Sequence, residues 1–93
     1  GSGGPTAEIG GQLLRRLGER GQVLTVTHLP QVAAQGHHHL FVHKVRHSDT
    51  THTAVASLGK RERVEEVARM LGGIDLTKES LAHARKMVVS GKA

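Results

Sequence analysis

Apolar residues recur at helical spacing in the first part of the chain. They occupy Ile9, Leu13, Leu14 and Leu17. Pro5 suits the first turn of such a helix, where its missing N–H is not needed, and Gly18 and Gly21 bracket the exit. The pair Gly10 and Gly11 lowers helix stability by about 1 kcal/mol per residue relative to Ala. The same pair would also allow another backbone to come close to this helix.

A second pattern, short and rich in β-branched residues, follows at residues 22–27 (QVLTVT). It predicts a buried strand, and because it is apolar on both faces it should have neighbours on either side in a sheet. The chain then turns from Thr27 to Pro30, and residues 31–35 can make about one helical turn before Gly36. Residues 22–34 are therefore interpreted as a strand and the loop that follows it.

Strand-like composition returns at residues 39–46 and 51–58, with a turn sequence at residues 48–50. The two segments predict a β-hairpin over residues 39–58.

Two helices are predicted over residues 60–90. The first covers 60–71, where Val64, Val67, Ala68 and Leu71 share one face and Gly72 and Gly73 form the stop. Thr77 can cap the second helix, which carries Leu81, Ala84 and Val88 on one face. Both apolar stripes are interpreted as facing the core. The whole order predicts an α/β fold: a helix, a buried strand, a short helix, a β-hairpin and two helices.

The length and composition limit what this chain can be. Its 93 residues allow one small domain or a piece of a larger one, and its single Phe, with no Trp or Tyr, leaves a thin aliphatic core. The lack of cysteine excludes a disulfide scaffold, a thiolate zinc site and a cysteine nucleophile, and it fits a reducing compartment. No apolar stretch is long enough to span a membrane, and no signal-peptide pattern is present. We therefore expect a cytoplasmic location.

The charge balance favours a polyanionic partner such as nucleic acid. Thirteen Lys and Arg face eight Asp and Glu, which gives a net charge of +5. The bases are scattered and have no aromatic side chains between them for base stacking, so most are interpreted as solvated surface. They include Arg15, Arg16, Arg20, Lys44, Arg46, Lys60, Arg61, Arg63 and Lys86. A free-standing basic domain that binds nucleic acid without catalysis is one possible function.

Candidate chemistry is concentrated in the histidines. In open α/β sheets ligands bind beyond the carboxyl ends of strands, so His28, directly after the predicted strand, is the first candidate; the alternative is a solvent-facing loop histidine. Six of the eight histidines fall near the predicted hairpin: His37, His38, His39, His43, His47 and His52. Consecutive histidines point to opposite faces of a strand, so we expect solvated loop and strand-edge residues and no metal site. The serines lack a nucleophile-elbow context.

The sequence of residues 22–34, QVLTVTHLPQVAA, favours a functional His28 over a solvent-facing loop histidine. Preceded by GGPTA at residues 3–7 and followed by GHHH at 36–39, it closely resembles the C-terminal end of the RecN family of bacterial DNA-repair ATPases. That family belongs to the SMC-like branch of the ABC ATPases. The resemblance continues through Lys44, the hairpin, the helix and stop at residues 63–73 and the LAHA run at 81–84, and so covers nearly the whole chain.

The resemblance implies roles for particular residues. His28 corresponds to the catalytic switch histidine of an ABC head, which reaches the γ-phosphate of ATP. Gly3 and Gly4 correspond to the tail of the D-loop and contribute to cofactor binding, whereas Gly1 and Ser2 are vector residues or precede the family pattern. Residues 1–93 would then be the C-terminal lobe segment of an ABC-type P-loop NTPase head.

The resemblance also implies what lies elsewhere in the complete protein. No Walker A, signature or Walker B motif is present here, so ATP and Mg²⁺ would be bound mainly by other parts, and this chain alone should not hydrolyse ATP. The implied partners are the N-terminal half of the same head, a second head in an ATP-dependent dimer, and DNA. The implied function is ATP hydrolysis in double-strand-break repair and recombination, in a cytoplasmic, nucleoid-associated protein.

Overall fold

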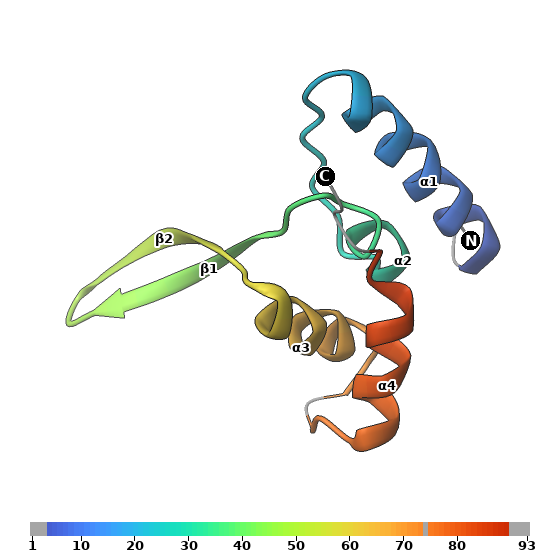
Figure 1. Ribbon diagram of the computed structural model, residues 1–93. Helices are drawn as coiled ribbons and strands as arrows, with labels where there is room; N and C mark the ends of the chain where they lie inside the picture. Colours follow the sequence, from blue (N-terminus) through green and yellow to red (C-terminus); the bar gives the residue numbers. More distant parts are fainter. Residues whose placement is uncertain (1–3, 74, 90–93) are drawn as a thin grey trace.

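The computed structural model describes residues 4–73 and 75–89, which form four helices and one β-hairpin (Figure 1). The elements are α1 (Gly4–Arg20), α2 (Pro30–Ala33), β1 (Leu40–His47), β2 (Thr50–Ser57), α3 (Lys60–Met70) and α4 (Lys78–Met87). This mixture of helices and strands agrees with the predicted α/β class. None of the helices in the described ranges is both long and apolar enough to cross a membrane.

The hairpin has the predicted position. β1 and β2 pair antiparallel from Leu40 opposite Ser57 to His47 opposite Thr50, and Ser48 takes a positive φ of 47° in the turn between them. Figure 1 shows the hairpin projecting away from the helices. One of its faces is open to solvent, with Val42 and Val55 opposite each other and each 61% exposed.

The core lies where α3 and α4 meet the end of α2. Its buried residues are Ala34, Val67, Ala68 and Ala84, and Val67 is fully buried. Partly buried apolar residues pack around them: Val64, Leu71, Leu76, Leu81, Met87 and Val88. The predicted core-facing stripes of the last two helices are therefore confirmed. So is the cap, because the Thr77 side chain accepts a hydrogen bond from Ser80 N at 2.9 Å.

The first helix packs against α2 through its smallest residues. Ala7 and Gly11 are buried, whereas the larger Ile9, Leu13 and Leu17 are more than half exposed. A Cβ at Gly11 would meet the carbonyl oxygen of Gln31 at 3.0 Å, so only glycine allows this approach. The predicted close approach of a second backbone is thus confirmed at Gly11.

The prediction of a buried strand at residues 22–27 is wrong for this structure. The segment has no regular secondary structure, and Leu24 and Val26 are 83% and 94% exposed. A strand needs a neighbour to pair its backbone N–H and C=O groups, and in the described part of the chain β1 and β2 pair only with each other. The apolar side chains that would fill a sheet are consequently left in solvent.

Candidate functional site

His28 lies in the loop between the exposed segment 22–27 and α2, and its side chain is exposed. Two features shape this loop locally. The backbone N–H of Leu29 donates to Thr27 Oγ1 at 3.0 Å, and Pro30 opens α2, where its missing N–H costs nothing. The imidazole is therefore exposed to solvent on a short turn. The Thr27–Leu29 hydrogen bond and Pro30 at the start of α2 restrict the backbone of this turn.

The opposite end of α2 is held by two arginines that come from other helices. Arg63 on α3 donates from Nη2 to the carbonyl oxygens of Ala33 at 3.2 Å, Ala34 at 3.3 Å and Gly36. Arg15 on α1 donates from Nη1 to the carbonyl oxygen of Gln35 at 2.7 Å. These bonds satisfy backbone oxygens at residues 33–36, the turn that ends α2.

Arg63 is buried, with 7% of its surface exposed. Its burial lowers the pKa of its guanidinium from the ordinary value, and the positive charge of Arg15 lowers the pKa further. Most of the scattered bases were interpreted as solvated surface, and Arg63 is an exception to that interpretation. The sequence does contain an indication of this burial. Arg63 lies four residues before Val67, so the two residues share the apolar face of α3.

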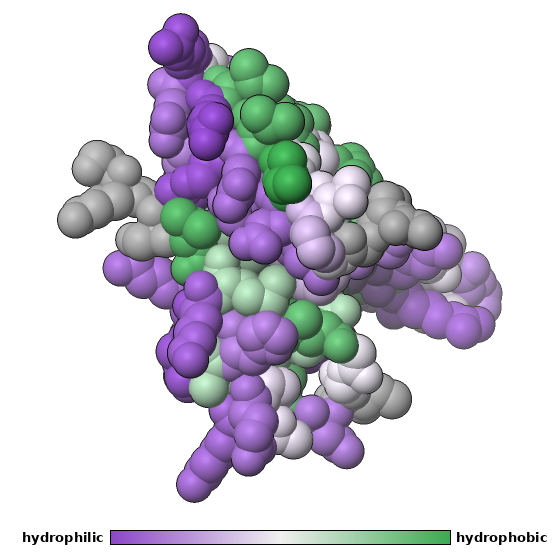
Figure 2. All heavy atoms as spheres, turned by 90° about the vertical axis from the view of Figure 1, so that its right-hand side faces the viewer, coloured by the Kyte–Doolittle hydropathy of each residue, from purple (hydrophilic) through white to green (hydrophobic). Residues whose placement is uncertain are grey.

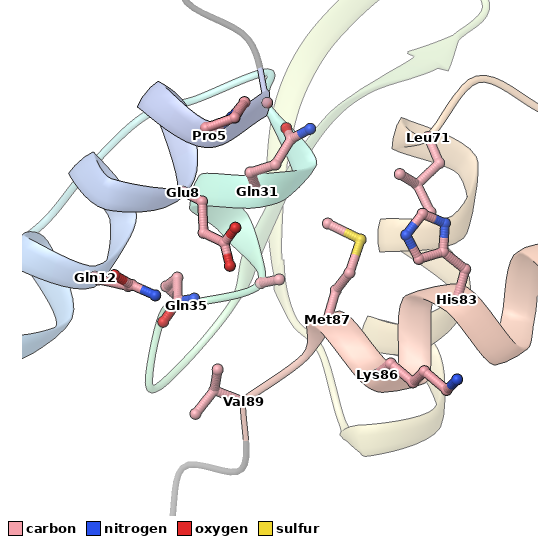
Figure 3. A pocket seen from close by; sticks show the side chains of 12 residues that line it. Pro5, Glu8, Gln12, Gln31, Gln35, Leu71, His83, Lys86, Met87 and Val89 are labelled. Carbon is pink, nitrogen blue, oxygen red and sulfur yellow. The ribbon is translucent and has the colours of Figure 1, made fainter.

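Of the two glycines assigned to cofactor binding, Gly4 is the first residue of α1, with a φ of 50°, and Gly3 lies outside the described residues. Gly4 lines a hollow between α1, α2 and α4 (Figure 3). In Figure 3, Glu8 and Gln12 border it from α1, and His83 and Met87 from α4. His28 is not among the twelve lining residues drawn there, so this hollow is not a site shared by His28 and Gly4.

The other histidines do not converge. His47 and His52 stack with ring centroids 5.4 Å apart, and Phe41 stacks on His43 at 5.3 Å. His39 Nδ1 is buried without a hydrogen-bond partner; burial lowers the pKa of His39, the charge of Arg63 lowers it further, and Glu66 opposes the shift. Within residues 4–73 and 75–89, no three His, Cys, Asp or Glu side chains are placed to share a metal ion.

Comparison with known proteins gives a consistent result. No protein-family model matches the chain. It is 49% identical to a Vibrio cholerae protein named DNA repair protein RecN over 90 residues, which is 97% of this chain. Proteins of the same name from Xylella fastidiosa and Streptomyces coelicolor are 53% identical over 88 residues and 40% identical over 93 residues, or 95% and 100% of the chain.

The chain is homologous to a segment of the RecN proteins. The resemblance found in the sequence is therefore confirmed, and the name of these RecN relatives connects them to DNA repair. The chain spans 16% of the length of each of the three.

Proposed function

We propose that this chain is the C-terminal segment of the RecN ATPase head and that it contributes to an ATP site used in DNA double-strand-break repair and recombination. The observation that carries the proposal is the match of 95–100% of the chain to proteins named DNA repair protein RecN. In this proposal His28 acts at the γ-phosphate of ATP, and Gly3 and Gly4 form the D-loop tail at the interface of two heads. The complete protein would work in the cytoplasm, at the nucleoid.

The position of His28 supports its proposed role. An exposed imidazole can donate a hydrogen bond to a phosphate oxygen that gains charge during hydrolysis. The turn from Thr27 to Pro30 limits the movement of the backbone that carries it, so the imidazole could meet a phosphate with little reorganisation. The Mg²⁺ ion and the contacts to the rest of ATP would come from other parts of the complete protein.

The exposed apolar side chains favour an incomplete head over a free-standing nucleic-acid-binding domain. They include Ile9, Leu13 and Leu17 on α1 and Val23, Leu24 and Val26 in the segment that follows. Figure 2 shows apolar surface gathered at the upper part of the molecule, where α1 ends in Figure 1. Apolar surface of this kind marks a protein interface. The N-terminal half of the same head is the proposed partner that covers it.

The His28→Ala variant of the complete protein tests the proposal. We expect ATP turnover to fall about 10²- to 10³-fold, the usual effect of losing one donor to a developing negative charge. Thermal melting should not change, because His28 is exposed. His38→Ala, at another exposed histidine, is the matched control and should retain full turnover. Unchanged turnover in His28→Ala would remove the assignment.

A DNA titration separates the proposal from a free-standing nucleic-acid-binding domain. The isolated chain should bind DNA only in the micromolar range or more weakly at about 150 mM salt, because few dispersed bases can contact phosphates at once. Nanomolar binding that persists at this salt concentration would favour the free-standing domain.

A further inference from the structure

We propose that Arg63 is a positioning residue for His28: it holds α2 at its C-terminal end and so fixes the loop that carries the histidine. The inference rests on the proposed role of His28 in ATP hydrolysis. Arg63 itself lies on α3 and has no place in the proposed contacts to ATP.

The contacts of Arg63 concentrate on one short turn. A single nitrogen, Nη2, donates to three carbonyl oxygens, those of Ala33, Ala34 and Gly36, which lie 27 to 30 residues earlier in the chain. In the described part of the chain, Arg63 is the one charged residue that is buried. Moving a cation out of water is costly, and Arg63 Nε is itself buried without a hydrogen-bond partner, so the bonds from Nη2 to these oxygens are what offsets the cost and favours this arrangement.

Helix α2 needs such support from outside. It has only four residues, its preceding residue Leu29 provides no side-chain cap, and isolated helices of this length are unstable in water. It is held on one side by the contact with Gly11 and at its end by Arg63 and Arg15. His28 lies two residues before α2 begins, so a shift of α2 moves the backbone that carries the imidazole.

An arginine at position 63 fits this role better than an apolar residue would. The two guanidinium groups approach neighbouring carbonyls of residues 33–36 from α1 and α3, although their like charges disfavour the approach. An apolar side chain would fill the space beside Val67 without this penalty. It would leave the Gly36 carbonyl oxygen without the donor that now orients it, whereas the Ala33 and Ala34 oxygens would keep only the bonds from the backbone N–H groups of Gly36 and Val89.

A double-mutant cycle in the complete protein tests the inference. Arg63→Met retains the length of the side chain and removes the donors, and Arg63→Lys retains a donor of different geometry. We expect kcat for ATP hydrolysis to fall at least 10-fold in Arg63→Met and about 3-fold in Arg63→Lys, with less than a 2-fold change in KM. Neither substitution should lower kcat further when His28 is already Ala. Arg69→Met is the control, because Arg69 is exposed on the same helix and pairs with Glu66.

The outcomes separate this inference from the proposed function. If His28→Ala leaves turnover unchanged, the proposed role of His28 fails. Suppose instead that His28→Ala lowers turnover. The positioning role is then overturned if the Arg63 substitutions do not lower kcat, or if they lower it by the same factor with His28 present and with His28 replaced by Ala. Where Arg63→Met does not fold, Arg63→Lys decides the cycle. Where the His28→Ala protein is too slow to measure, the NMR signal of the His28 ring should shift in Arg63→Lys and not in Arg69→Met; an unshifted signal overturns the inference.

Discussion

Gly11 of α1 lies so close to Gln31 of α2 that a Cβ atom at Gly11 would be 3.0 Å from the Gln31 carbonyl oxygen. The same Cβ would be 3.2 Å from Val32 Cα, and neither backbone atom can move without moving α2. We therefore expect Gly11→Ala to lower the free energy of unfolding by about 1–2 kcal/mol, since the strain of overpacking exceeds the gain in helix propensity. Urea unfolding of the chain at low concentration measures the change.

The neighbouring glycine supplies the control. A Cβ at Gly10 meets nothing within 4 Å, so Gly10→Ala should instead raise the free energy of unfolding by up to about 1 kcal/mol. Equal effects of the two substitutions would show that α1 does not pack on α2 as described.

Val67 tests the location of the core. Its side chain is fully buried between α3 and α4, and Val67→Ala should lower the free energy of unfolding by about 2–3 kcal/mol through lost burial and the cavity left behind. Val42→Ala, on the open face of the hairpin, removes the same two methyl groups from a residue that is 61% exposed. It should change stability by less than about 0.5 kcal/mol. A similar loss at both positions would contradict the assignment of the core to the helices.

The elements that the sequence predicted correctly are those that depend on residues close together in the chain. The hairpin, α3 with its apolar stripe and the Thr77 cap all depend on neighbours in the chain, and the sequence predicted each of them. The strand at 22–27 depends on partners distant in sequence, which the described residues do not provide. The burial of Arg63 was not predicted, because a positive charge indicates a solvated side chain even at a position on the same helix face as Val67. The proposed role of His28 rests on the resemblance and on the exposed position of its side chain.

His39 should make stability depend on pH. Its pKa is lowered from the ordinary value of 6.5, first by burial and then by Arg63. The unfolded chain therefore binds a proton to this residue at a higher pH than the folded chain does, so stability is fully present above about pH 6.5 and is lost as the pH falls through the folded-state pKa. The melting temperature should fall between about pH 7.5 and pH 5, and the fall should be smaller in His39→Gln. His38→Gln, at an exposed neighbour, should retain the whole fall; equal slopes in both variants would refute the contribution of His39.

Val26 distinguishes an incomplete head from a self-sufficient domain. Its side chain is 94% exposed, so in the isolated chain Val26→Lys should leave the melting temperature unchanged and should reduce self-association, as measured by sedimentation. In the complete protein the proposed N-terminal half of the head covers this segment, and a buried unpaired lysine there should cost several kcal/mol and lower the yield of folded protein. Thr25→Lys, in the same exposed segment, is the control for adding a charge to the isolated chain. If Val26→Lys is harmless in the complete protein as well, the segment is a surface loop there and the proposed interface with the N-terminal half is wrong.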